Sequence, residues 1–142
     1  MNADSGSTPP PRFISPHAEG EFYWTSGADG VLRLQRCGDC RRYIHPPGPV
    51  CPYCHSRDLA PEPIAGTGTI ATFTINRKEW IPGFEPPYVF ALVEIDEDPT
   101  IRLGTNIVGC GVDEVEIGMR VAVEFEANGE WHVPLFHPIP TE

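Results

Sequence analysis

The 142-residue chain has 20 acidic and 10 basic residues, which give a formal net charge of −10 at neutral pH. Fourteen of the acids but only four of the bases lie in residues 61–142, and this balance disfavours binding to a phosphate backbone, which depends on Lys and Arg. The length suits one ordinary domain or a small metal-stabilised module beside a small barrel, and 17 Pro and 14 Gly favour turns and strands over helices.

Residues 1–12 are rich in Ser, Pro, Asn and Asp, and the three consecutive prolines Pro9 to Pro11 disfavour a packed element. We therefore expect a disordered tail over residues 1–12. The N-terminus has no charged segment followed by an apolar one, and the chain has no run of about 18 apolar residues. These features predict a cytoplasmic protein without a membrane span.

A short helix is expected from Ser15-Pro16 to about Ser26, because serine caps a helix and proline suits its first position. Its apolar residues Phe22, Tyr23 and Trp24 are adjacent, so they cover a broad arc of the helix surface. Two interpretations remain open. The helix packs on its own domain, or its aromatic face docks on another subunit.

Two Cys-x-x-Cys turns, separated by ten residues, follow an alternating strand over residues 31–36. Each turn places two thiolates on one side of a tight loop, for which Gly38 and Pro52 are suitable, and two facing turns form the tetrahedral four-sulfur site that zinc accepts. Four thiolates leave no position for water or substrate, so we predict a structural zinc ion and not a catalytic one. The predicted ligands are Cys37, Cys40, Cys51 and Cys54.

Other interpretations of the cysteines are weaker. Two disulfides would require an oxidising compartment, and a thioredoxin-like redox site would require one Cys-x-x-Cys opening a helix. His45 and His55 are further metal-ligand candidates, but four cysteines already complete the site.

Five arginines lie around the predicted site in the sequence, against two acids, Asp39 and Asp58. They either offset the negative charge of the four thiolates and remain solvated, or bind phosphates or a partner's carboxylates. These arginines are Arg33, Arg36, Arg41, Arg42 and Arg57.

From residue 64 onward the pattern is that of a β-barrel. Five strands without a long helix predict a small closed Greek-key barrel of the OB type, and Asn128-Gly129 predicts the hairpin between the last two strands. Gly66 and Gly68 mark a sharp bend in the first strand. The gap over residues 109–119 holds an acidic turn where many OB-folds carry a helix. The strands are expected at residues 64–75, 88–95, 100–108, 120–126 and 131–136.

The loop over residues 77–87 combines Trp80, Ile81 and Phe84 with three prolines. So much apolar area in a loop is costly unless something covers it. The loop either folds back over the barrel mouth or forms a surface for a ligand or partner. We therefore expect the partner or ligand contacts to be Phe22, Tyr23, Trp24, Trp80, Ile81 and Phe84.

Several motifs in one order resemble a known family. They are Pro-Pro-x-Pro between the cysteine turns, Gly-x-Gly-Thr, Pro-Gly-Phe followed by Pro-Pro-Tyr, Val-Glu-Ile-Asp-Glu and Ile-Gly-Met-Arg-Val. From Phe13 to Phe136 the chain is similar to the zinc-ribbon OB-fold proteins linked to acyl-CoA metabolism. The resemblance implies a rubredoxin-like ribbon before the OB-fold, in a protein that partners thiolase-fold enzymes of the lipid-transfer-protein type. Such enzymes act as thiolases or aldolases on steroid and other acyl-CoA thioesters.

The expected fold is thus mostly β, with residues 1–12 as a tail, 13–62 as helix and zinc ribbon, and 63–142 as the OB-fold. The expected function is a non-catalytic accessory subunit of an acyl-CoA aldolase or thiolase, in steroid side-chain or fatty-acid degradation. Alternatives are a stand-alone acyl-CoA-binding module or hydratase partner, and a nucleic-acid-binding OB-fold. Cys110, between two glycines, is interpreted as a small buried residue and not as a nucleophile.

Overall fold

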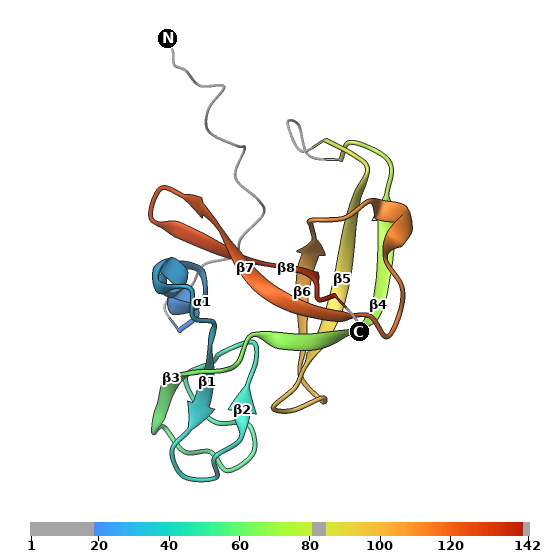
Figure 1. Ribbon diagram of the computed structural model, residues 1–142. Coiled ribbons are helices and arrows are strands. Elements are labelled where there is room, and N and C mark those ends of the chain that lie inside the picture. Colours follow the sequence, from blue (N-terminus) through green and yellow to red (C-terminus); the bar gives the residue numbers. More distant parts are fainter. Residues whose placement is uncertain (1–18, 81–84, 141–142) are drawn as a thin grey trace.

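A computed structural model describes residues 19–80 and 85–140. The predicted fold class is confirmed: one short helix precedes a cysteine-rich ribbon and a closed five-stranded barrel (Figure 1). The elements are α1 (Glu21–Thr25), the 3-10 helix η2 (Ser26–Asp29), β1 (Arg33–Cys37), β2 (Tyr43–Ile44), β3 (Leu59–Pro63), β4 (Thr67–Asn76), β5 (Tyr88–Ile95), β6 (Arg102–Ile107), the 3-10 helix η3 (Val112–Glu114), β7 (Arg120–Asn128) and β8 (Trp131–Pro138).

The helix differs in part from the one expected. Its described part begins at Glu21, continues through η2, and ends at Gly30, whose φ of 81° is favourable only for glycine. The expected tail and the expected start at Ser15 lie outside the described residues, and the division at residue 62 stays a prediction. Among the described residues, no helix has the length and apolar character needed to cross a bilayer.

The ribbon is an antiparallel sheet in the order β2-β1-β3. Gln35 in the central strand is buried, and its side chain bonds both backbone groups of Gly48, accepting from the N–H at 3.0 Å and donating to the carbonyl at 2.9 Å. These two bonds hold the proline-rich connection between the cysteine turns against the sheet. The buried amide therefore satisfies its own polar groups and those of a loop at the same time.

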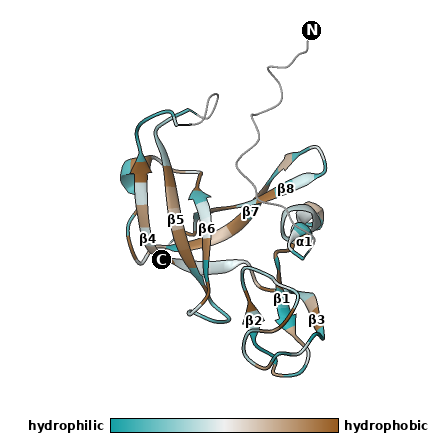
Figure 2. Cartoon of the chain, turned by 180° about the vertical axis from the view of Figure 1, so that it is seen from behind, coloured by the Kyte–Doolittle hydropathy of each residue, from teal (hydrophilic) through white to brown (hydrophobic). Residues whose placement is uncertain are grey.

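The barrel strands follow the order β4-β5-β6-β8-β7, and β4 pairs with β7 to close the sheet. The β6–β8 pair is parallel and the others are antiparallel. Successive side chains of a strand point to opposite faces of the sheet, and this alternation determines which residues form the core. In β5, Val89, Ala91, Val93 and Ile95 are buried, whereas Phe90 between them is 45% exposed. Figure 2 shows the apolar residues concentrated along these strands.

The long strand β4 bends, although not at its glycines. The register of the β4–β5 pair shifts between Ile70 and Thr72, which follow Gly68 in the strand. Gly68 is required for a different reason, because a Cβ there would lie 2.4 Å from the carbonyl oxygen of Glu94. Gly66, with φ of 80°, turns the chain from the ribbon into the barrel.

The N-terminal helix packs on its own chain. Tyr23 is 6% exposed and belongs to the same apolar core as Leu32, Leu34 and the barrel interior. Gly27 packs so closely on Phe125 of β7 that a Cβ would overlap the ring. Tyr23 is thus unavailable at the surface, whereas Phe22 and Trp24 on the same helix remain partly exposed.

Candidate metal centre and aromatic groove

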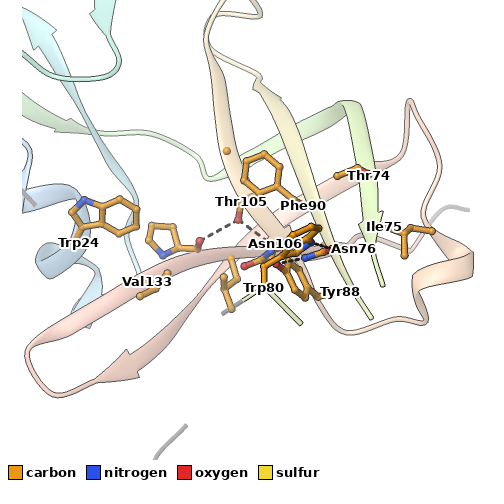
Figure 3. A pocket seen from close by; sticks show the side chains of 13 residues that line it. Trp24, Thr74, Ile75, Asn76, Trp80, Tyr88, Phe90, Thr105, Asn106 and Val133 are labelled. Carbon is orange, nitrogen blue, oxygen red and sulfur yellow. Dashed lines mark hydrogen bonds between the residues drawn. The ribbon is translucent and has the colours of Figure 1, made fainter. Parts of the chain in front are cut away.

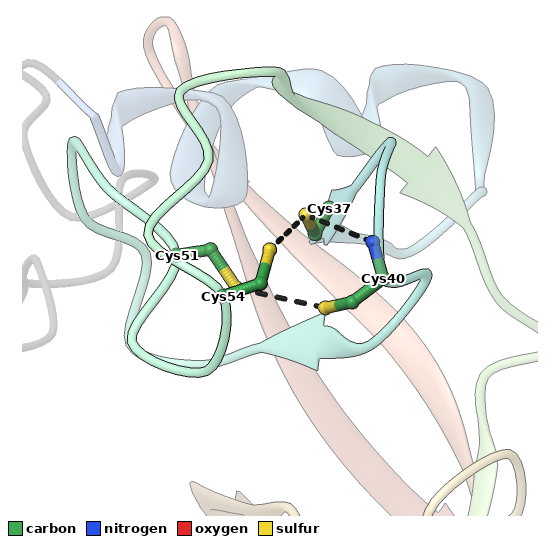
Figure 4. Close-up of side chains that lie close together, drawn as sticks. All are labelled: Cys37, Cys40, Cys51 and Cys54. Carbon is green, nitrogen blue, oxygen red and sulfur yellow. Dashed lines mark hydrogen bonds between the residues drawn. The ribbon is translucent and has the colours of Figure 1, made fainter.

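The four predicted cysteines converge at one end of the ribbon (Figure 4). Their sulfur atoms all lie within 4.8 Å of one another, with 3.6 Å between Cys37 and Cys54 and 3.7 Å between Cys40 and Cys51. A tetrahedral zinc with bonds of about 2.3 Å places its sulfurs about 3.8 Å apart, whereas a disulfide requires about 2.05 Å. The cysteines are free thiols positioned to bind a metal ion, and Zn²⁺ fits this four-sulfur set.

Local backbone geometry builds each cysteine turn. The N–H of Arg41 donates to the carbonyl of Cys37, and the N–H of His55 donates to the carbonyl of Cys51, at 3.1 and 2.9 Å. Arg41 and His55, each directly after the second cysteine of its turn, have φ of 65° and 67°. The sequence pointed to Gly38 and Pro52 as the turn residues, but the left-handed positions belong to non-glycine residues.

The ribbon supplies donors to the sulfurs. The N–H groups of Cys40 and Asp39 each lie 3.4 Å from Cys37 Sγ, and these donors, that of Cys40 first, lower the pKa of this thiol to about 6. Burial raises the pKa of Cys51, but the N–H groups of Cys54 and Tyr53 outweigh it, so its pKa is lowered. Deprotonated sulfur is the form that binds zinc, and these donors favour it at Cys37 and Cys51. At Cys54 the N–H of Ser56 lowers the pKa, but burial and the three neighbouring thiols outweigh it and raise the pKa to about 12.

Four of the five arginines named from the sequence have partners that the local sequence did not reveal. Arg36 and Arg41 both pair with Glu62 of β3, at 3.4 and 3.3 Å, and Arg33 pairs with Asp29 at 2.7 Å. Arg42 lies over the Tyr53 ring, 4.5 Å from its centroid. These arginines are thus paired within the chain, which leaves less cationic charge to offset the thiolates or to bind phosphates.

His45 faces the core and not the cysteine cluster. Its ring lies 5.1 Å from the Tyr23 ring, and its Nδ1 is buried without a hydrogen-bond partner in the described part of the chain. Burial lowers the pKa of His45 to about 4. The folded chain therefore holds a neutral imidazole at pH values where an unfolded chain would take up a proton.

Because His45 is buried as a neutral imidazole, we expect the folded protein to lose stability at acid pH. His45 protonates near pH 6.5 in the unfolded chain and only near pH 4 in the folded one. The contribution of the neutral His45 to the free energy of unfolding is therefore fully present above pH 6.5 and is lost as the pH falls toward 4. Between pH 7.5 and 5 this loss amounts to about 2 kcal/mol. We expect urea unfolding of His45→Phe, which keeps an aromatic ring, to show a correspondingly smaller loss than wild type. Parallel pH profiles of the two proteins would contradict the assignment.

A second feature is a hollow of about 510 Å³ on the outer face of the barrel, the aromatic groove (Figure 3). Four aromatic rings contribute to its walls, those of Trp24 from α1, Trp80 from the loop after β4, and Tyr88 and Phe90 from β5. The groove thus unites one residue from each of the two aromatic segments singled out in the sequence. The expected contacts Ile81 and Phe84 lie outside the described residues.

Trp80 is 66% exposed but held in place. Its Nε1–H donates to Asn76 Oδ1 at 2.8 Å, and the Asn76 amide in turn donates to the Tyr88 hydroxyl. The Lys78 ammonium lies 4.6 Å from the centroid of the Trp80 ring, a cation–π contact. The loop therefore presents a positioned indole, which costs little entropy to bind.

The groove residues that lie on strands were not predicted from the sequence. Thr74, Tyr88, Phe90 and Asn106 come from three strands, and they meet only because the barrel register places them on one outward face. The available signal was the strand alternation itself: outward positions in an acidic barrel carry aromatic and amide groups here instead of charges.

A four-cysteine ribbon followed by a closed barrel of this strand order defines the class of zinc-ribbon OB-fold proteins. Two family models match the chain: "ChsH2, rubredoxin-like zinc ribbon domain" over residues 24–60 and "ChsH2, C-terminal OB-fold domain" over residues 61–126. The chain belongs to this ChsH2-type, DUF35 family.

Three curated relatives are similar over much of the chain. A "Probable enoyl-CoA hydratase alpha subunit" of Thermomonospora curvata is 42% identical over 85% of this chain. A "3-oxo-4,17-pregnadiene-20-carboxyl-CoA hydratase alpha subunit" of Mycobacterium tuberculosis is 29% identical over 82%. A "DUF35 domain-containing scaffold protein" of Pyrococcus furiosus is 32% identical over 61% of this chain and 67% of its own length. The chain spans only 38% and 37% of the two hydratase subunits.

One solved structure matches nearly from end to end. A chain of the "Ltp2-ChsH2(DUF35) aldolase" superposes with a TM-score of 0.80 and 38% identity, covering 89% of this chain and 98% of that one. The similarity therefore extends over the helix, ribbon and barrel together and is not limited to the cysteine motif.

Proposed function

We propose that this chain is a non-catalytic accessory subunit that binds and supports a thiolase-fold enzyme, an aldolase or thiolase acting on acyl-CoA thioesters. The observation that carries the proposal is the match over 98% of the DUF35 chain of an aldolase complex. The name "scaffold protein" of an archaeal relative is in keeping with a role in assembly. The four-thiolate zinc site, which needs reduced thiols, supports placing the complex in the cytoplasm.

The proposed contact surface is the rim of the aromatic groove. Trp24 from α1 and Trp80 from the loop both line the groove with large apolar side chains, and interface energy concentrates in such anchors. Phe22, partly buried on the same helix, is proposed to belong to this surface. Ile81 and Phe84 are proposed to extend this surface. The buried Tyr23 supports the helix from below instead of contacting the partner.

The chemistry of Cys110 supports a non-catalytic role. Burial, and then the charge of Glu114, raise the pKa of this thiol, so little nucleophilic thiolate is present at neutral pH. The cysteines of the ribbon are arranged to saturate a metal and leave no position for substrate.

We expect the purified chain to turn over no acyl-CoA thioester by itself. The measurement is thioester consumption by the chain alone, with Cys110→Ala as the matched variant. Substantial turnover by the wild type that Cys110→Ala abolishes would contradict the accessory role.

A second candidate is favoured by the names of the two hydratase alpha subunits, in which a segment like this chain is part of a longer protein. Under that reading the chain would assist a hydratase. Assays of co-purified complexes separate the two partners: a hydratase adds water to the carbon–carbon double bond of an enoyl-CoA, whereas an aldolase or thiolase breaks a carbon–carbon bond.

A further inference from the structure

The aromatic groove differs in charge from the rest of the molecule. The chain carries 20 acids and 10 bases, yet within the described residues the lining of the groove contains no charged side chain. Beside it, the Lys78 ammonium lies over the Trp80 ring, 4.6 Å from the ring centroid, but an occupant with several phosphates or carboxylates would lose more hydration than this one ammonium can offset. The groove selects an uncharged occupant.

Three polar side chains of the lining, those of Asn76, Thr105 and Asn106, are already bonded to the protein. Thr105 Oγ1 donates to the carbonyl of Pro134 at 3.1 Å, and Asn106 Nδ2 donates to the carbonyl of Val89 at 2.9 Å. Asn76 is bonded to Trp80 and Tyr88. An occupant needs few hydrogen bonds here, so apolar contact with the aromatic rings is the main attraction.

The size and shape indicate a small molecule with flat faces. A volume of about 510 Å³ lies in the range of sites for drug-sized ligands, roughly 300–1,000 Å³. Figure 3 shows Trp80 beside Tyr88 and Asn76, with Trp24 apart from them beyond Val133. Rigid fused rings suit such walls, because they lose little conformational freedom on binding.

We propose that the aromatic groove binds the apolar acyl group of the thioester, with fused-ring groups of the steroid type as the best match, while the charged CoA moiety stays outside. This inference rests on the proposed function, which supplies such thioesters. The groove is open to solvent, since Trp80 is 66% and Phe90 45% exposed, and a partner docked on its rim would cover the bound rings. The accessory subunit would then contribute one wall of the substrate site.

The test is calorimetric binding of androst-4-ene-3,17-dione, an uncharged four-ring ketone, to the full chain. We expect a Kd on the order of tens of micromolar for a ligand of this size, and no binding of CoA alone. Thr74→Phe places a ring inside the groove and should weaken binding about tenfold or more. Thr72→Phe is the matched control, because Thr72 is exposed on the same strand but does not line the groove, and it should bind like wild type.

The inference is overturned if the wild type binds no dione, or if Thr74→Phe binds it as well as wild type. It is also overturned if Thr74→Phe only prevents co-purification of the enzyme partner, because the groove would then hold a partner side chain. Failure of the wild type to co-purify with any thiolase-fold enzyme would instead refute the proposed function and leave the ligand measurement standing.

Discussion

Replacing Cys40 with serine is expected to remove zinc from the protein and to unfold the ribbon. The apolar cluster of the ribbon is small, with Cys37, Ile44 and Cys51 buried and Cys40 and Leu59 packed against it, so three of its five members are ligands themselves. Structural zinc contributes roughly 10–16 kcal/mol of apparent binding free energy in zinc-finger peptides, more than such a cluster can replace. Metal analysis and limited proteolysis measure both effects.

Cys110→Ser is the matched control, because it also removes a thiol but lies outside the cluster. It should retain one equivalent of zinc and an intact ribbon. The barrel closes through its own strand pairs, so it should survive in Cys40→Ser as a protease-resistant fragment, although less stable, because Leu34 of β1 belongs to the same apolar core. Purified wild-type protein with less than half an equivalent of zinc would contradict the assignment.

The second large effect is expected at Trp80. Its indole is exposed yet fixed by Asn76, so Trp80→Ala removes a positioned anchor without opening a cavity in the core. We expect the affinity for the enzyme partner to fall by roughly 2 kcal/mol or more, about thirtyfold, with zinc content and barrel stability unchanged. Titration of the partner by calorimetry or interferometry gives both Kd values.

An acidic residue such as Glu114 is a poor control, because Glu114 Oε1 accepts the N–H of Gly111 at 2.8 Å and closes the turn before β7. Tyr53→Ala is cleaner, since this aromatic ring is 52% exposed on the ribbon and away from the groove lining. It should bind the partner like wild type. Equal affinity of wild type and Trp80→Ala would remove the groove rim from the interface.

The cysteine cluster and most barrel strands could be predicted because their signals are local. Ligand spacing fixes Cys37 to Cys54, and alternation marks β5 and β7 within a residue or two. Strand β3 was missed because Pro61 and Pro63 argue against a strand. It lies at the edge of the sheet, where an unpaired side tolerates proline.

The groove could not be predicted as one site, because it depends on contacts between distant segments. Trp24 and Trp80 belong to a helix and a loop far apart in the sequence, and barrel closure brings them to one face. Likewise, neither the burial of Tyr23 nor the pairing of Arg36 and Arg41 with Glu62 has a local signature. Adjacent aromatic residues indicate that a surface exists but not which ring faces inward.

We propose that this chain supports a separate catalytic subunit, and enzyme turnover tests the proposal directly. The direct measurement is carbon–carbon cleavage of an acyl-CoA thioester by the Ltp2-type enzyme of the same organism, purified alone, with wild-type chain, and with Trp80→Ala. We expect little or no turnover by the enzyme alone, full turnover with wild type, and reduced turnover with Trp80→Ala that recovers at high concentration of the variant. Equal turnover of the enzyme with and without the wild-type chain would contradict the proposal.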